Sequence, residues 1–418
     1  MKTKAVRLYG ENDLRLEEFE LPEIKDDEIL AHIISDTLCM SSYKAAIQGS
    51  KHKRVPADIA ENPVIIGHEF CGEIVQVGKK WADKYKAGSK FTIQPALNGS
   101  LVNPGYSYKY IGGNATYIII PPEVMELDCL LEYKGDAFYY GSLAEAMSCI
   151  VGAYHAAYHT TPGVYIHNMG IVEGGNCAYL GAAGPMGLGA IDYTIHCDRK
   201  PKKVVVVDID QGRLDRAASV LTVEDAKNNG VELVYLNTSG YDKPEEVILA
   251  LTDNKGYDDV FVYAPVKALV ETGDKILGRD GCLNFFAGPT NPAFSAEFNF
   301  YNVHYSSTHI VGTSGGNTAD MIESLEMMST GKINPSIMIT HVGGLDAAIE
   351  TTMNLPNIRA GKMLIYTNIK MPLTAINDFA ELGRTDAVFA ELDRIIKANN
   401  GLWCYDAEKY LLANAENI

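Results

Sequence analysis

Residues 176–208 read NCAYLGAAGPMGLGAIDYTIHCDRKPKKVVVVD, and this stretch determines the fold of the middle of the chain. A short apolar run ends in a glycine-rich turn, an apolar helical segment follows as far as about Cys197, and the run VVVV begins at 204. Strand, helix and strand in this order predict a βαβ unit. Four consecutive valines are typical of a strand buried on both faces, so we expect a parallel sheet covered by helices.

The segments on either side of the βαβ unit differ in character. The N-terminal third contains short β-type runs broken by Gly, Pro or Asn, which predict a mostly-β, barrel-like domain. These runs are 28–35, 73–78, 90–96 and 115–121. After residue 176, strands alternate with helices, which predicts a Rossmann-like, doubly wound α/β domain. Its further strands are expected at 233–236, 259–264, 282–287 and 309–312.

Three parts follow from these patterns. A catalytic domain is expected over 1–151 and is completed by 315–370, where helices near 318–329 and 345–353 precede a strand within 362–369. The nucleotide-binding domain is expected over 152–314. The tail, 371–418, carries amphipathic stretches at 386–400 and 407–418 that we predict to be helices packed on the catalytic domain or on a neighbouring subunit.

Composition excludes several classes of protein. The 418 residues are 47% hydrophobic and 21% charged, with a net charge of −17, which is typical of a globular enzyme and argues against nucleic acid or an anionic membrane as a partner. The start MKTKAVRLYGEND is charged too early for a signal peptide, so a cytoplasmic location is expected. The eight cysteines include no CxxC pair, so neither disulfides nor a four-cysteine zinc site is expected.

The glycine-rich turn has the features of a dinucleotide site. Backbone N–H groups and the positive end of a helix can approach a pyrophosphate there, and Asp208 ends the next strand, where a carboxylate accepts from a ribose hydroxyl and repels a 2′-phosphate. NAD(H) is therefore favoured over NADP(H). The alternative is that the glycines only permit close packing. The residues expected at the cofactor are Gly181, Gly184, Pro185, Met186, Gly187, Asp208 and Arg213.

A second group of residues has metal-binding character. Cys39, the Gly67-His68-Glu69 segment and Glu145 supply a thiolate, an imidazole and two carboxylates, which are the ligand types of a catalytic Zn²⁺ with one open position. His68 and Glu69 are expected where a strand begins, and Glu145 ahead of a helix. Taken singly, a histidine or a cysteine is more often a core residue.

Four motifs carry a resemblance to the zinc-dependent medium-chain dehydrogenase/reductase family: SDTLCMSSYKA at 35–45, NPVIIGHEF at 62–70, GYSYKYIGG at 105–113 and SLAEAMSC at 142–149. It covers about residues 1–370 and is strongest for the polyol and sugar-phosphate dehydrogenases. It implies a GroES-like catalytic domain, a Rossmann domain and hydride exchange between NAD(H) and an alcohol or ketone. Met40 and Ala146 depart from the family pattern without removing a ligand.

The resemblance also implies roles. Cys39, His68 and Glu69 become zinc ligands, with Glu145 as a fourth ligand or an alternate that exchanges with water. Residues 94–116 lack the cysteines of a structural zinc, so one zinc per subunit is expected. Ser41, with Ser42 as the alternative, would begin a proton relay, although a helix N-cap would also use its hydroxyl.

The substrate is inferred from nearby cations. Lys44 and the stretch KHKR at 51–54 could hold a phosphate, although charge runs usually face water. The phosphate candidates are therefore Lys44, Lys51, Lys53 and Arg54, with Tyr108, Lys109 and Tyr110 unranked. The resemblance implies a reaction that interconverts a ketose 1-phosphate and a hexitol 6-phosphate; the alternatives are an unphosphorylated polyol or a catalytically silent dinucleotide-binding protein. By analogy with the family, the resemblance also implies a homo-oligomer, dimer or tetramer, paired through the strands near 282–287 and 309–312.

Overall fold

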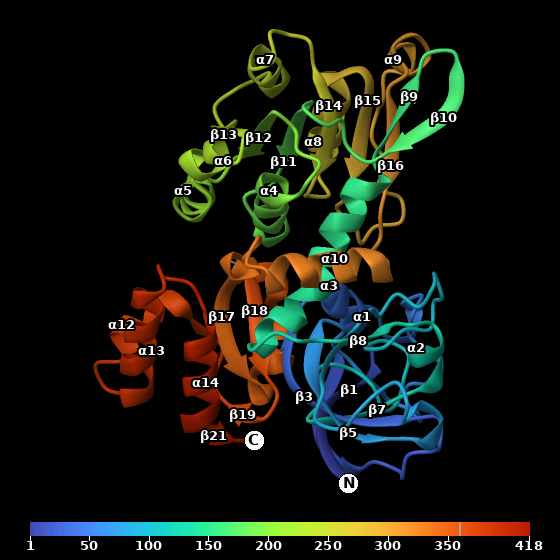
Figure 1. Ribbon diagram of the computed structural model, residues 1–418, viewed down its shortest axis with the longest axis vertical. Helices are drawn as coiled ribbons and strands as arrows, with labels where there is room; N and C mark the ends of the chain where they lie inside the picture. The colour runs from blue at the N-terminus through green and yellow to red at the C-terminus, as the bar shows by residue number, and fades with distance from the viewer. Residues whose placement is uncertain (359–360) are drawn as a thin grey trace. The chain divides into compact units, whose positions relative to one another are not determined.

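The computed structural model describes residues 1–358 and 361–418, and the chain divides into two compact units (Figure 1). Unit 1 comprises Met1–Ala146, Asn317–Thr330 and Pro335–Ile418, and unit 2 comprises Met147–Gly316 and Gly331–Asn334. Within the described ranges, we find no helix whose length and apolar character would let it cross a membrane.

Unit 2 is built on a parallel sheet. Its described strands have the order β13-β12-β11-β14-β15-β16, and each neighbouring pair is parallel, as predicted for a doubly wound fold (Figure 1). Residues 204–207 are buried, as the valine run predicts. The strands are β11 (Asn176–Leu180), β12 (Lys203–Asp208), β13 (Glu232–Asn237), β14 (Tyr257–Val262), β15 (Leu277–Phe285) and β16 (His309–Gly312).

Helices connect these strands, and a hairpin precedes them. The hairpin joins β9 (Tyr158–Thr161) to β10 (Val164–Met169), and its turn contains Pro162 and Gly163. One core cluster of the sheet is mainly aliphatic, including Val205, Val260 and Leu283, while Tyr179 and Phe261 are buried aromatic residues of the same strands. The helices are α4 (Pro185–His196), α5 (Gln211–Val220), α6 (Val223–Asn228), α7 (Pro244–Ala250), α8 (Lys267–Ile276) and α9 (Phe300–Ser306).

Unit 1 is mostly β. Its larger sheet has the order β20-β17-β18-β3-β5-β6-β8, with β7 beside β3, and its smaller sheet has the order β2-β1-β4. Strand β18 pairs with β3, so the end of the chain completes a sheet that its beginning starts. The strands are β1 (Lys2–Gly10), β2 (Asp13–Glu20), β3 (Ile29–Thr37), β4 (Val64–Ile65), β5 (Phe70–Val77), β6 (Lys90–Ile93), β7 (Tyr117–Ile120), β8 (Leu130–Glu132), β17 (Ile339–Gly344), β18 (Lys362–Tyr366), β19 (Ile369–Lys370), β20 (Thr374–Ala375) and β21 (Glu416–Asn417).

Three helices of unit 1, α12, α13 and α14, lie together in the C-terminal tail (Figure 1). The prediction of helix through Ile418 is wrong at its end: Glu416 and Asn417 form β21, because their backbone groups pair with β19. Helix α3 (Phe138–Ala156) begins in unit 1 and ends in unit 2. The others are α1 (Met40–Gln48), α2 (Pro122–Glu126), α10 (Thr318–Ser329), α11 (Ala348–Asn354), α12 (Phe379–Leu382), α13 (Ala387–Ala398) and α14 (Tyr405–Asn414).

Candidate metal centre and dinucleotide-binding turn

Three donor side chains converge in unit 1. The potential ligand atoms of Cys39, His68 and Glu69 all lie within 4.8 Å of one another. Cys39 precedes α1, and the other two precede β5 after Gly67, whose φ of +93° is a conformation that favours glycine. Tetrahedral zinc with bonds of about 2.0–2.3 Å separates its ligands by roughly 3–4 Å. The donor types of this thiolate, imidazole and carboxylate set fit the ion, and the 4.8 Å bound is slightly wider than that spacing, so the side chains would close in on bound zinc.

The serines after Cys39 have different surroundings. The interpretation of Ser41 as a helix N-cap is wrong, because Cys39 is the N-cap and its Sγ accepts from the Ser41 backbone N–H at 3.5 Å. The buried Ser42 hydroxyl lies 3.3 Å from His68 Nδ1. A metal-binding histidine usually has a partner on its second ring nitrogen, and Ser42 would be that partner for a metal bound at Nε2.

Glu69 is held by two donors. The ammonium of Lys362, on β18, contacts both of its carboxylate oxygens, and the Thr37 hydroxyl donates to one of them. Burial alone raises the pKa of Glu69, but the charges of Lys362 and His68 outweigh it, so this pKa is lowered. Glu69 is therefore ionised. No sequence motif singles out Lys362, which is distant in the chain.

Glu145 lies inside α3 rather than ahead of a helix, which corrects the expectation, because α3 already begins at Phe138. Its side chain is buried. Burial raises its pKa to about 7, and the charges of Glu69 and Cys39 also raise it while His68 lowers it. Among the described residues, Glu145 is not part of the close donor group of Cys39, His68 and Glu69, but its carboxyl is electrostatically coupled to that group and titrates near neutrality.

Tyr106 is a further residue of this site that the sequence pattern does not single out. Its hydroxyl lies 3.2 Å from His68 Nε2, and its side chain is buried. It follows Gly105, where an added Cβ would lie 2.0 Å from the Gly67 carbonyl oxygen. The signal available in the sequence is the motif GYSYKYIGG, whose glycines allow this loop to pack on the turn that carries His68.

The predicted phosphate cations separate into two groups. The Arg54 guanidinium lies over the Tyr106 ring, 5.1 Å from its centroid, and Lys44 is half-buried. Burial lowers the pKa of His52 to about 4, and the charges of Arg54, Lys53 and Lys44 lower it further, so these cations surround it. In contrast, Lys51 pairs with Glu11 in solvent.

The other candidates in that region have different partners. The Tyr108 hydroxyl donates to Glu123 at 3.0 Å, and Lys109 lies over the ring of Tyr110.

The glycine-rich turn of unit 2 joins β11 to α4. Gly181 has a φ of +67°, so it makes the tight turn although the next residue is Ala182. An added Cβ on Gly187 would lie 1.9 Å from the Ala182 carbonyl oxygen, whereas one on Gly184 would meet no atom within 4 Å. Pro185 and Met186 open α4. Gly187 thus permits close packing, and Gly184 faces open space at a helix N-terminus, where an anion can approach.

Asp208 lies beside this turn. Its carboxylate accepts from the Ala183 N–H at 3.0 Å and from the Ile209 N–H at 2.8 Å. Arg213, on α5, is partly exposed and lies 3.9 Å from Asp210. The acidic residue and the turn are therefore held together.

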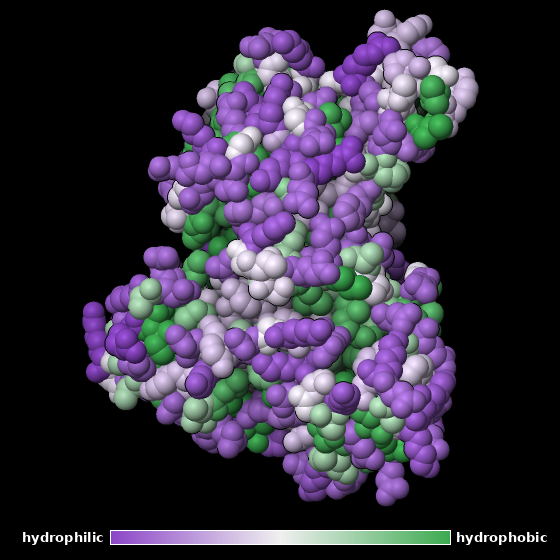
Figure 2. All heavy atoms as spheres, in the orientation of Figure 1, coloured by the Kyte–Doolittle hydropathy of each residue, from purple (hydrophilic) through white to green (hydrophobic). Residues whose placement is uncertain are grey.

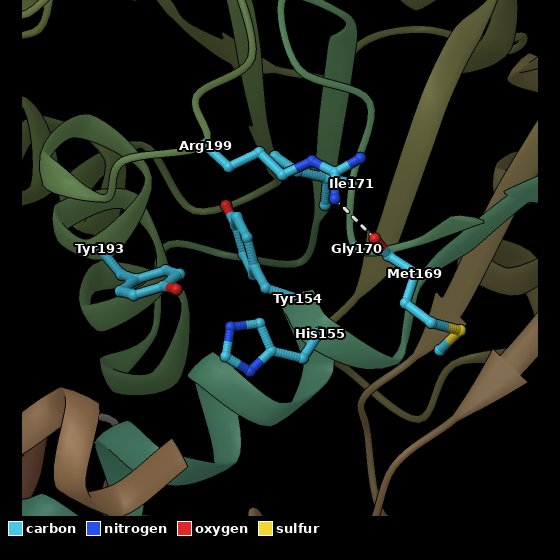
Figure 3. A pocket seen from close by; sticks show the side chains of 7 residues that line it. All are labelled: Tyr154, His155, Met169, Gly170, Ile171, Tyr193 and Arg199. Carbon is cyan, nitrogen blue, oxygen red and sulfur yellow. Dashed lines mark hydrogen bonds between the residues drawn. The ribbon is translucent and has the colours of Figure 1, made fainter. Parts of the chain in front are cut away.

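A cavity of about 290 Å³ lies elsewhere in unit 2 (Figure 3). It borders the C-terminal end of α4, the end opposite to Pro185. The Arg199 guanidinium donates there to the Met169 carbonyl oxygen at 2.5 Å. It contains none of the predicted site residues. Its lining residues are Tyr154, His155, Met169, Gly170, Ile171, Tyr193 and Arg199.

Comparison with known proteins identifies the family of the chain. Residues 25–128 match the family model of the alcohol dehydrogenase GroES-like domain, and residues 185–330 match that of the zinc-binding dehydrogenases. The chain is 55% identical to mannitol-1-phosphate 5-dehydrogenase of Aliivibrio fischeri over 98% of its length and 97% of the relative. It is 46% identical to L-sorbose 1-phosphate reductase of Klebsiella pneumoniae over 100% of this chain and 98% of the relative.

Solved structures agree on the fold. The 2R,3R-butanediol dehydrogenase of Bacillus subtilis superposes with a TM-score of 0.70 at 20% identity, covering 88% of this chain and 100% of that one. An alcohol dehydrogenase of Escherichia coli CFT073 in complex with NADH superposes with a TM-score of 0.67 at 17% identity, covering 87% and 99%.

The fold and the donor group define a two-part oxidoreductase, with a GroES-like domain and a Rossmann-type sheet. The chain belongs to the zinc-type medium-chain dehydrogenase/reductase family and is an oxidoreductase of the polyol and sugar dehydrogenase type. Zinc and a nicotinamide cofactor are the groups that this family uses.

Proposed function

We propose that this chain is an NAD(H)-dependent zinc enzyme that interconverts L-sorbose 1-phosphate and D-glucitol 6-phosphate. The observation that carries the proposal is the close group of Cys39, His68 and Glu69. One catalytic zinc per chain and no structural zinc are part of the proposal. So is a cytoplasmic location, since eight free cysteines are typical of a reducing compartment. The proposed domains are a catalytic domain over 1–151 that 315–370 completes, a nucleotide-binding domain over 152–314, and a C-terminal extension over 371–418.

We assign Cys39, His68 and Glu69 as zinc ligands, with Glu145 as a fourth ligand or an alternate that exchanges with water. Burial raises the pKa of Glu69, but the charges of Lys362 and His68 lower it overall, which supports an ionised carboxylate. Burial raises the pKa of Glu145 to about 7, which supports a group that changes charge near neutrality. When bound, zinc supplies a Lewis acid for the substrate oxygen, and the nicotinamide gives or takes the hydride.

Proton transfer is assigned to the hydroxyls around His68. The Tyr106 phenol hydrogen-bonds with the Ser41 side chain and lies 3.2 Å from His68 Nε2, while Ser42 lies at the other ring nitrogen. A connected line of hydroxyls can carry a proton away from a reacting alcohol. This supports Ser41 as the start of the relay, with Tyr106 beside it.

Cofactor binding is assigned to the turn of unit 2: Gly181, Gly184, Pro185, Met186 and Gly187, with Asp208 and Arg213. The open space at Gly184 supports a pyrophosphate at the start of α4. The buried Asp208 carboxylate supports NAD(H), because a 2′-phosphate next to it would be repelled.

Phosphate binding is assigned to Arg54 and Lys44. Arg54 has a buried Nε without a hydrogen-bond partner, and a phosphate oxygen would satisfy such a donor. Its guanidinium lies over Tyr106, which itself contacts His68, so a substrate held by both the metal and Arg54 would be short. A sugar phosphate has that size.

The identity to a mannitol-1-phosphate 5-dehydrogenase favours a second candidate substrate. The two substrates differ in geometry: in L-sorbose 1-phosphate the reacting C2 adjoins the phosphate-bearing C1, whereas C5 and C1 of mannitol 1-phosphate are separated by three carbons. Stereochemistry and this spacing together would decide between them.

The test is NADH oxidation by the zinc-loaded chain with L-sorbose 1-phosphate, and with L-sorbose as the unphosphorylated control. D-Mannitol 1-phosphate with NAD⁺ is measured alongside. We expect turnover of L-sorbose 1-phosphate that Cys39→Ala abolishes and that Cys197→Ala, at a cysteine of unit 2 outside the donor group, leaves unchanged. Turnover of mannitol 1-phosphate alone would favour the second candidate. Equal rates with L-sorbose would assign an unphosphorylated polyol.

A homo-oligomer is also part of the proposal, through the β16 side of unit 2. Residues 154–172 and 298–319 contain no Asp, Glu, Lys or Arg, in a chain with a net charge of −17. They include the hairpin β9–β10, α9 and the edge strand β16, and the hairpin contacts β16 because Tyr158 stacks on His309. Figure 2 shows hydrophobic atoms at the hairpin tip. Two acidic copies could associate through an uncharged surface and an unpaired edge.

A further inference from the structure

Helix α14 buries one carboxylate, that of Glu408, at the end of α3. The side chain is 1% exposed and accepts hydrogen bonds from the backbone N–H groups of Phe138 and Tyr139 at 2.7 and 2.9 Å. The Tyr366 hydroxyl donates to it at 2.8 Å. A buried carboxylate is stable only with such donors, so Glu408 joins three elements of unit 1.

The first element is α3. Phe138 and Tyr139 form its first turn, where backbone N–H groups have no partner within the helix and the helix dipole favours an anion. Glu145 lies seven residues after Phe138, which is two turns along the same face. The carboxylate of Glu408 therefore caps the helix that carries Glu145, about 10 Å from it along the axis.

The second element is β18. Lys362 and Tyr366 lie four residues apart in this strand, so their side chains are on the same face, about 13 Å apart. Tyr366 donates to Glu408, and Lys362 pairs with Glu69. One end of β18 is thus attached to α14 and the other to the donor group.

Trp403 reinforces the link. Its indole N–H donates to the Tyr366 hydroxyl at 2.9 Å, and its side chain is fully buried. Since Tyr366 accepts from Trp403, its own hydrogen is directed at Glu408. The segment from Trp403 to Glu408 lies beyond residue 330, where the family-model matches end.

We propose that Glu408 is a positioning residue for the metal centre. Its carboxylate fixes the position of the first turn of α3, and therefore the position of Glu145 further along that helix. It also fixes the position of Tyr366 at the end of β18, and therefore the position of Lys362, which pairs with Glu69. The proposal rests on the proposed zinc centre. Outer residues that orient metal ligands typically change metal affinity by about 10- to 100-fold when they are altered.

The test is Glu408→Gln in the full chain. The amide has the same size, but it has one acceptor oxygen, and its NH₂ group faces a donor. We expect unchanged far-UV circular dichroism and unchanged NADH affinity, with zinc affinity about 10-fold weaker in chelator competition. A changed absorption spectrum of the Co²⁺-substituted protein is expected as well. Lys409→Gln, at an exposed neighbour on α14, is the matched control and should match the wild type.

Tyr366→Phe is a milder second variant. It keeps the carboxylate on α3 but removes the link to β18, and we expect zinc affinity about threefold weaker, within the range of one lost hydrogen bond. A folded Glu408→Gln variant with wild-type zinc affinity and a wild-type Co²⁺ spectrum would overturn the inference. If Glu408→Gln does not fold, wild-type zinc affinity and a wild-type Co²⁺ spectrum in Tyr366→Phe would overturn it instead. A wild-type chain that holds no zinc would refute the proposed centre, whereas one that holds zinc but reduces no sugar phosphate refutes only the substrate.

Discussion

The Lys362 ammonium contacts both carboxylate oxygens of Glu69, and the two residues are 293 positions apart in the sequence. Both side chains are buried. An ionised carboxylate inside a protein needs a counter-charge or donors, so this pair is what keeps Glu69 charged beside Cys39 and His68. The charge of Glu69 therefore depends on a strand near the end of the chain.

Lys362→Met should destabilise the metal-free protein by about 3 kcal/mol at pH 7, because a buried carboxylate loses its cation. Burial raises the pKa of Glu69, yet Lys362 lowers it more. A lowered pKa stabilises the fold above the unfolded carboxyl pKa, and this contribution is lost as pH falls through the folded value. Urea unfolding should thus show a difference from wild type that shrinks in acid. Lys362→Arg is the control, and equal stability of the Met variant would contradict the prediction.

Gly184→Ala and Gly187→Ala should have different effects. A methyl group at 187 would lie 1.9 Å from a carbonyl oxygen, so we expect a large fall in melting temperature. A methyl group at 184 meets no atom, so the fold should be unaffected, while NADH affinity falls about 10-fold because the pyrophosphate would occupy that space. Fluorescence titration and thermal unfolding measure both. Wild-type NADH binding by Gly184→Ala would place the cofactor elsewhere.

Arg54→Leu should raise the KM for L-sorbose 1-phosphate about 10-fold or more, since one charge-assisted phosphate contact is worth about 1.5–3 kcal/mol. Any slow reduction of L-sorbose should be unaffected. Lys51→Leu is the matched control, because Lys51 pairs with Glu11 in solvent. Steady-state kinetics with both sugars provide the measurement. An equal rise in KM for both variants would show that the positive charges attract the phosphate at long range and that Arg54 does not bind it directly.

Tyr165 and Ile166 at the hairpin tip are strongly exposed. Replacing both with serine should weaken self-association about 100-fold, because aromatic and aliphatic anchors dominate interfaces. Sedimentation equilibrium would then show smaller species. Tyr241→Ser, at an exposed tyrosine elsewhere in unit 2, should leave the oligomer intact. An unchanged oligomer in the double variant would exclude the hairpin from the interface.

His159 anchors the hairpin through Asp259, 3.1 Å away, and both are buried. Burial lowers the pKa of His159, but the bonds to Asp259 and Asp280 outweigh it, so the pKa is raised. A raised histidine pKa stabilises the fold fully below the unfolded pKa of about 6.5, and the contribution disappears as pH rises through the folded value. His159→Gln should therefore cost about 2 kcal/mol at pH 5.5 and less at pH 9 in urea unfolding. A cost independent of pH would mean that His159 is neutral.

Local patterns predicted much of this molecule. The strand-turn-helix-strand order of 176–208 is confirmed, because each element there satisfies its own periodicity and the valine run needs burial on both faces. The end of the tail was predicted incorrectly: its helical pattern continues to the last residue, but pairing with β19 competes successfully for the backbone. Contacts of that kind leave no local signal.

The sequence by itself determined the chemistry available: a thiolate, an imidazole and carboxylates in short motifs, and a glycine turn before a helix. Only the tertiary structure decided which charges meet. Lys362 reaches Glu69, Tyr106 reaches His68, and Glu408 caps α3, across separations that no periodicity encodes. The reason is physical. Donor chemistry belongs to a single residue, whereas the pKa and position of a buried carboxylate depend on neighbours that strand pairing brings together.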